Sequence, residues 1–85
     1  MECRLDVSRE GGHAVVRIQG RLGGVAVREL ERVCRDASAP LVLDLTHLMN
    51  ADDCGVATVR RLVVDGAQVK GVSPYLSLLL GLDGA

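Results

Sequence analysis

The sequence contains neither phenylalanine nor tryptophan, and Tyr75 is its single aromatic residue. Because 48% of its residues are nevertheless hydrophobic, valine, leucine and alanine must fill the core. A chain with so few aromatics lacks the stacking platform on which single-stranded nucleic acids bind. Its formal net charge is −1, with both signs mixed along the chain, so there is no basic stripe for a phosphate backbone. We therefore expect no nucleic-acid partner.

The cysteines are odd in number and show no pairing pattern. Cys3, Cys34 and Cys54 lie far apart and form no C-x-x-C motif, which is typical of a reduced protein that uses cysteine as a small hydrophobic residue. The apolar run 76–82 is too short to span a bilayer. The sequence also shows no charged start followed by an apolar region, the pattern that would predict a signal peptide. These absences predict a cytoplasmic protein with no direct membrane insertion.

The length of 85 residues leaves room for one domain, 1–85, with no second core and no long linker. Within it, 3–7 alternate polar and apolar residues with the period of a strand, and a second strand is expected over 13–19. The turn signal Glu10-Gly11-Gly12 between them predicts an antiparallel hairpin. Apolar residues then recur with helical spacing over 25–35, which predicts an amphipathic helix.

A nearly continuous apolar run over 41–45 predicts a central strand covered on both faces. The spacing over 56–64 favours a second helix, although 62–64, rich in valine, fits a strand as well. The turn signal that follows makes this helix short.

The last part of the chain predicts a short strand over 67–72 and a final helix. Ser73 suits the N-cap of that helix and Pro74 its first position, while Gly81 suits the residue after its end near Leu80. The whole order is β-β-α-β-α-β-α, an α/β fold.

The loop between 41–45 and the second helix carries Asp52, Asp53 and Cys54. A helix start stabilises anions, so one aspartate is explained as an N-cap and the other is not. Four functions remain open from the residues: a metal site with His47, a nucleophilic Cys54 with His47 or His13 as base, a phospho-accepting aspartate, and a protein-docking loop. The first two lack a recurrent ligand spacing or motif, and the third requires a longer chain, so protein docking is favoured.

Five blocks, in order, resemble the STAS domain family, which includes bacterial anti-sigma factor antagonists. They are 15–22 (VVRIQGRL), 29–31 (ELE), 41–46 (LVLDLT), 52–56 (DDCGV) and 69–74 (VKGVSP). The resemblance covers nearly the whole chain. It implies a mixed sheet of about four strands with three helices packed on one side.

The resemblance also implies a regulatory loop. In antagonists of this family the loop reads Asp-Ser-Ser-Gly-Leu or Asp-Thr-Ser-Gly-Leu, and an anti-sigma factor that is also a kinase phosphorylates its first hydroxyl residue. By position, Asp52 matches the motif's aspartate, Cys54 its second small residue and Gly55 its glycine, while Asp53 falls on the phosphorylated hydroxyl. Asp53 cannot accept a stable phosphoester, and it resembles a partial, permanent imitation of the phosphorylated state (a phosphomimetic).

Two further departures lie near the surface that binds the partner in this family. Gly23, close to Arg21 in the loop before the first helix, stands where relatives commonly carry an acidic residue. The second helix is a turn or two shorter than usual. We expect Arg21, Gly23, Asp52, Asp53, Cys54 and Gly55 to form the partner-binding site, with Gly55 letting a partner backbone approach closely.

Three functions follow from the resemblance. The first is a non-catalytic regulatory module that binds an anti-sigma factor or serine-kinase-like protein. The alternatives are a STAS subunit that docks on an ABC-type ATPase in lipid transport, and a module that binds a small ligand or nucleotide. In each case we expect no catalytic residue, metal or cofactor, and a homodimer is compatible with the sequence.

Overall fold

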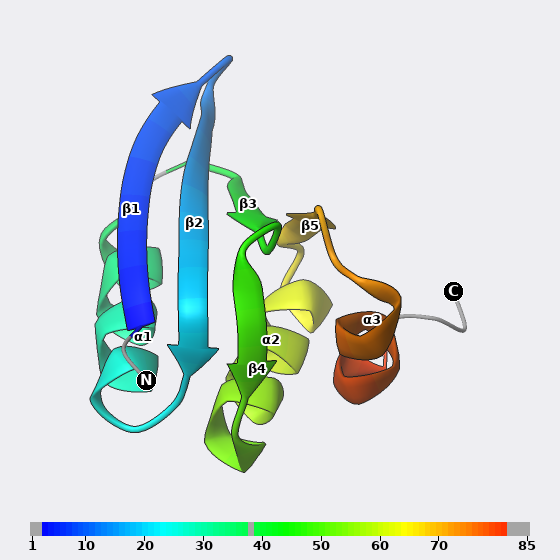
Figure 1. The fold of residues 1–85 in the computed structure, drawn as a ribbon. Helices are drawn as coiled ribbons and strands as arrows, with labels where there is room; N and C mark the ends of the chain where they lie inside the picture. Colours follow the sequence, from blue (N-terminus) through cyan, green and yellow to red (C-terminus); the bar gives the residue numbers. More distant parts are fainter. Residues whose placement is uncertain (1–2, 38, 82–85) are drawn as a thin grey trace.

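The computed structural model describes residues 3–37 and 39–81, which form one sheet and its helices (Figure 1). The order in this part of the chain is β-β-α-β-β-α-β-α. The elements are β1 (Cys3–Glu10), β2 (His13–Leu22), α1 (Val25–Asp36), β3 (Leu41–Asp44), β4 (Leu48–Ala51), α2 (Asp53–Val64), β5 (Gln68–Lys70) and α3 (Pro74–Leu80).

The sheet is mixed and is organised around β2. The main path is β1-β2-β3-β5, and β4 also pairs with β2. Only β1 runs antiparallel to its neighbour; the β2–β3, β2–β4 and β3–β5 pairs are parallel. Because β2 has ten residues, its first half pairs with β3 and its last residues remain available for β4.

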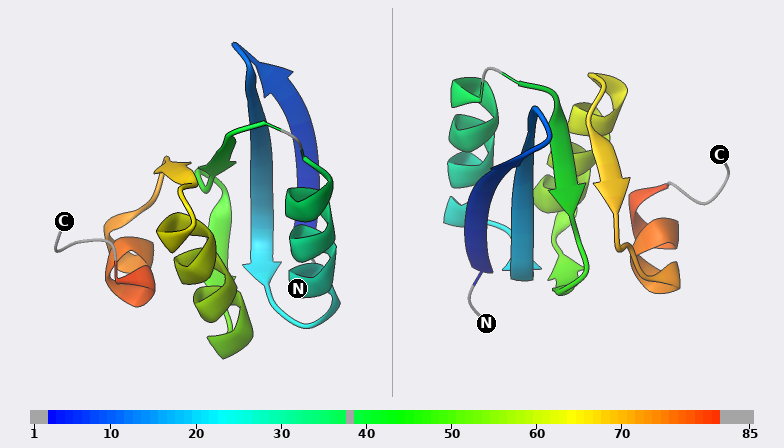
Figure 2. Two further views of the ribbon diagram at one scale, coloured as in Figure 1. Left: turned by 180° about the vertical axis from the view of Figure 1, so that it is seen from behind. Right: turned by 90° about the horizontal axis from the view of Figure 1, so that it is seen from above.

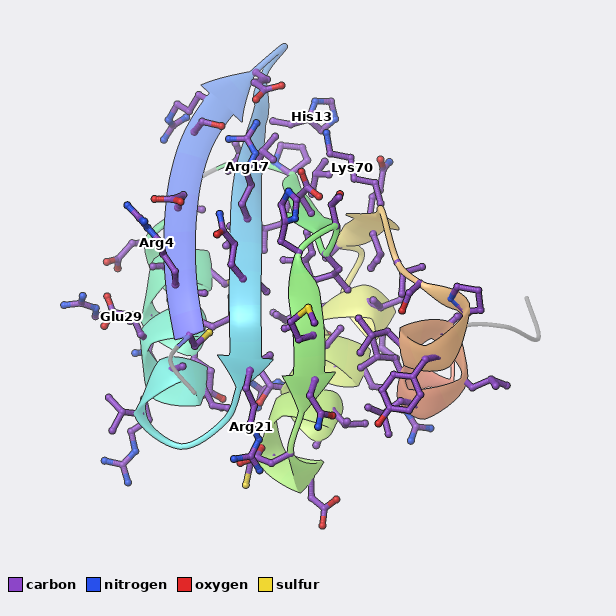
Figure 3. The ribbon with its side chains drawn as sticks, in the orientation of Figure 1. Arg4, His13, Arg17, Arg21, Glu29 and Lys70 are labelled. Atoms are coloured by element: carbon purple, nitrogen blue, oxygen red, sulfur yellow. The ribbon has the colours of Figure 1, made fainter. Side chains whose placement is uncertain are left out.

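Helices α1 and α2 cover one face of this sheet, and α3 lies at the side of the molecule opposite β1 (Figure 2). α3 packs against α2. The other face carries charged side chains, among them Arg4, Arg17 and Lys70 (Figure 3). The prediction that the 41–45 strand is covered on both faces is therefore wrong: β3 is central in the sheet, but helices cover only one of its faces.

The core is aliphatic, as the near-absence of aromatic residues requires. Its centre is β2, whose Val16, Ile18 and Leu22 are fully buried. The other buried members are Val27, Leu30, Leu43, Leu45, Leu48, Ala51, Val59, Leu62, Leu76 and Leu80. Each helix and each of the strands β2, β3 and β4 thus anchors itself in one shared cluster, which fixes where the loops at the sheet ends lie.

Most of the elements predicted from periodicity are confirmed. The hairpin is antiparallel, α1 occupies the predicted segment, and 62–64 is helical. The predicted ends of α3 are also confirmed: the Ser73 hydroxyl accepts a hydrogen bond from the amide of Leu76 at 3.2 Å, and Gly81 ends the helix with φ 71°. No helix in 3–37 or 39–81 is long and apolar enough to cross a membrane.

The strand β4 was missed, so the predicted number of about four strands is one too few. Leu48 and Ala51 are buried whereas Met49 and Asn50 are exposed, which breaks the alternation that marks a strand. β4 forms because β2 continues beyond β3, past the predicted end at Gln19. The register shifts between Gly20 and Arg21, where Gly20 has a positive φ of 85°, and the chain after β3 pairs with this free stretch.

Candidate partner-docking site

The predicted site lies where two parallel strands end and two helices begin. β2 ends at Leu22 and β4 ends at Ala51, and these two residues are register partners. The amide of Asp52 donates a hydrogen bond to the carbonyl of Leu22 at 3.0 Å. Because the carboxyl ends of parallel strands meet at one edge, the loops that start α1 and α2 are brought together.

Asp52 is committed to contacts inside the molecule. It is the N-cap of α2, and its Oδ1 accepts a hydrogen bond from the amide of Gly55 at 2.8 Å. Its carboxylate lies against Gly23: a Cβ added there would overlap Oδ2 and would lie 2.7 Å from Cγ of Asp52. The half-buried Asp52 carboxylate thus occupies the space that a side chain at position 23 would need.

Gly55 also serves an internal contact. It is buried in the first turn of α2, and a Cβ built on it would lie 2.5 Å from the carbonyl oxygen of Leu22. The expectation that Gly55 lets a partner backbone approach is wrong, because the backbone that approaches it is that of β2. Gly55 positions the loop without reaching the surface.

Asp53 differs from Asp52 in its exposure and in its hydrogen bonds. It is the first residue of α2, it is exposed, and its side chain has no hydrogen bond or ion pair to any other residue in the described ranges. Its carboxylate lies at the positive end of the helix dipole, which favours a negative charge there. Asp53 is therefore the carboxylate of this loop that a partner can reach.

The neighbouring exposed residues complete the surface. Arg21, near the end of β2, lies at the same end of the molecule (Figure 3). It is exposed, as is Cys54. Val25, at the start of α1, is 83% exposed and was not predicted as a site residue. The signal for it is weak, since an apolar residue at the start of an amphipathic helix is ordinarily assigned to the core.

The other chemistries considered for the loop are not assembled. His47 precedes β4 and Asp52 follows it, so a strand of four residues, about 13 Å long, separates them. His13 lies at the opposite end of β2 from Leu22, beside the hairpin turn. Neither histidine is placed to activate Cys54. No group of three or more His, Cys, Asp or Glu side chains in the described part of the chain could hold a metal ion.

Compared by sequence, the chain matches no protein-family model and no curated protein. Compared by structure, it is similar to solved proteins. One is described as "antisigma-factor antagonist, STAS domain from Rhodobacter sphaeroides", with a TM-score of 0.53 and 20% sequence identity over 86% of this chain and 91% of that one. The chain has the STAS fold.

A second solved structure, described as "Crystal Structure Analysis of Mglu", is similar with a TM-score of 0.67 and 24% identity. The match covers 81% of this chain and 20% of that protein, so the chain spans about a fifth of its length. Both similarities concern the fold. The first confirms the STAS architecture predicted from the five sequence blocks, with a fifth strand added.

Proposed function

We propose that this STAS-fold chain is a non-catalytic docking module, and that its Asp53 permanently takes the place of the phosphorylated residue of an anti-sigma factor antagonist. The observation that supports this is the difference in contacts and exposure between the two aspartates. Asp52 caps α2 and packs against Gly23, whereas Asp53 is exposed at the same helix start. A partner that reads charge at this position meets the carboxylate of Asp53.

The strength of the imitation follows from charge and geometry. A phosphorylated serine carries about −1.5 to −2 charges and three acceptor oxygens, while a carboxylate carries one charge and two oxygens. A kinase that binds only the unmodified form of its antagonist would therefore bind this chain weakly, yet more strongly than the doubly charged form. The expected partner is an anti-sigma factor or a related serine kinase.

The exposed residues around Asp53 suit a protein partner. Arg21 supplies a charge of the opposite sign at the same end of the molecule, and Val25 supplies an exposed apolar side chain. An interface commonly combines such apolar and charged groups, and the opposite charges set the orientation of the partner more than its affinity. No step in this function requires a reaction on the chain itself.

The test compares wild type with Asp53→Ser and Asp53→Ala for binding to, and phosphorylation by, the serine kinase of its host. Asp53→Ser should be phosphorylated and should bind the unmodified kinase at least about tenfold more tightly than wild type. Asp53→Ala should bind equally tightly without becoming modified. Asp65→Ser, at the other end of α2, is the matched control and should behave as wild type does.

Equal binding by all four proteins with no phosphorylation of Asp53→Ser would contradict the proposal. Native co-purification provides an independent comparison. Recovery of the chain with an ABC-type ATPase subunit, and not with a kinase, would assign it to the alternative function considered from the sequence.

A further inference from the structure

The strand β1 forms an open edge of the sheet. Among the described residues it pairs only with β2, and it is the outermost strand in Figures 1 and 2. It has eight residues, which is long for an edge that natural proteins leave uncovered. Edge strands of this kind pair readily with another strand.

The hairpin geometry determines which backbone groups face outward. Glu10 and His13 are opposite each other across a two-residue turn, and the residues that close such a turn form a hydrogen-bonded pair. The pattern then alternates along β2. Consistent with this, the amide of Ala14, the next residue, points away from β1 and donates to the carbonyl of Pro40 at 2.9 Å.

Counting back along β1 with the same alternation identifies its outward residues. Cys3, Leu5, Val7 and Arg9 direct their N–H and C=O groups away from β2, whereas the residues between them bond to it. A second strand can therefore bind this edge through these four residues without breaking any bond within the hairpin.

Beside this edge lies an open groove of about 650 Å³ between β1 and α1. Its floor is formed by Cys3, Leu5 and Val7, and its wall includes Val25. Val7 is 51% exposed and Val25 is 83% exposed. Pairing along the edge would bring new apolar side chains next to these residues, which water now covers.

We propose that β1 pairs antiparallel with β1 of a second copy of this chain, with Leu5 opposite Leu5 of that copy. In this register Cys3 faces Val7 of the second copy on the groove side. On the open face of the sheet, Arg4 faces Asp6 of the second copy, and the two-fold symmetry repeats this contact. A symmetric interface must be self-complementary, and this register satisfies that requirement for charge and for apolar side chains alike.

The neighbouring registers are less favourable. Sliding one strand so that Leu5 faces Val7 places Asp6 opposite Asp6 of the second copy, and like charges directly opposite are destabilising. Sliding further, so that Val7 faces Val7, places the apolar Leu5 opposite the charged Arg9. The sequence of β1 therefore favours the register with Leu5 opposite Leu5 over these two alternatives.

The groove side of α1 agrees with a two-fold axis. Glu29 lines the groove near one end of β1, and Arg32 and Asp36 line its continuation toward the other end. The two-fold axis would place α1 of the second copy antiparallel to this helix on the same face of the joined sheet. Alternating signs along α1 allow unlike charges to face each other in that arrangement.

The first test changes one outward amide. In Val7→Pro the lost N–H is one that faces away from β2, and an edge strand accepts proline at such a position. We expect sedimentation equilibrium to show a concentration-dependent dimer for wild type and for the control Val7→Thr, which keeps the N–H. Val7→Pro should weaken dimerisation at least about a hundredfold, with far-ultraviolet circular dichroism confirming that it is folded.

The second test determines the register of the two β1 strands and does not depend on how tightly the dimer forms. In a Cys3→Ser/Cys54→Ser background, Leu5→Cys should form a disulfide-linked dimer on mild oxidation, because directly opposite residues of a hydrogen-bonded pair lie about 5.5 Å apart at Cα, within disulfide range. Val7→Cys in the same background should not. Wild type that remains monomeric up to about 1 mM, dimers unaffected by Val7→Pro, or cross-linking of Val7→Cys in place of Leu5→Cys would each overturn the proposal. A complex only with a foreign protein through this edge would overturn it as well.

Discussion

Gly23 and Asp52 share one space at the end of the sheet, although 28 residues lie between them in the sequence. A Cβ at position 23 would overlap the carboxylate that caps α2. The Asp52 carboxylate can therefore cap α2 in this position because Gly23 has no side chain. In this chain any side chain at position 23 would meet the acidic cap directly, so the packing against Asp52 favours a glycine there.

This contact predicts a non-additive pair of substitutions. Asp52→Ala should lower the free energy of unfolding by about 1 kcal/mol, the usual cost of losing an N-cap. Gly23→Ala should cost a similar amount by displacing the cap. Because the methyl group has nothing to displace once the carboxylate is gone, Gly23→Ala should cost little in the Asp52→Ala background. Urea unfolding of the four proteins in a double-mutant cycle measures this coupling; strictly additive effects would show that the two residues do not interact.

For Gly55→Ala we predict a change in stability opposite in sign to the change expected from helix propensity. Gly→Ala inside a helix ordinarily stabilises by about 1 kcal/mol. Here the added Cβ would lie 2.5 Å from the carbonyl oxygen of Leu22, so Gly55→Ala should destabilise by about 1–3 kcal/mol through overpacking. Thermal and urea unfolding measure the effect, with Ala57→Ser, an exposed position of the same helix, as a control expected to change stability little. Stabilisation by Gly55→Ala would mean that α2 is not pressed against β2.

Asp44 predicts a pH dependence of stability at the end of β3. The hydroxyl and the amide of Thr46 both donate hydrogen bonds to its Oδ1, at 2.5 and 3.1 Å, and these bonds, the hydroxyl first, hold the pKa of this carboxyl below its usual range. A carboxyl whose pKa is depressed on folding stabilises the fold above the unfolded pKa of about 3.9. That contribution is lost as pH falls through the lower pKa of the folded state.

Asp44→Asn should therefore be less stable than wild type at pH 7, and the difference should shrink as the pH falls below about 4. Thr46→Ala should reproduce part of this loss, since it removes the hydroxyl but retains the amide donor, while Thr46→Ser should retain the wild-type dependence. Urea unfolding between about pH 2 and about pH 7 measures the pH dependence of stability for each protein. A difference between wild type and Asp44→Asn that stays constant over this range would contradict the assignment.

Much of the fold could be predicted from local pattern, because the physics that sets it is local. The alternation around Leu5 and the glycine turn predicted the hairpin, and Ser73, Pro74 and Gly81 predicted both ends of α3. The five sequence blocks predicted the STAS architecture that the structural comparisons confirm. The position of Asp53 at the start of a helix also followed from its neighbours in the chain.

The amino-acid sequence alone thus predicts the ends of α3, the charge carried by the loop and all elements except β4. The strand after β3 could not be predicted in this way, because β4 exists by pairing with the stretch of β2 that extends beyond β3. The difference in exposure between the two aspartates also depends on tertiary contacts. Asp52 and Asp53 are adjacent and chemically identical in the sequence. Leu22 at the end of β2 and Gly23 after it approach Asp52 and partly cover the cap, whereas Asp53 stays exposed.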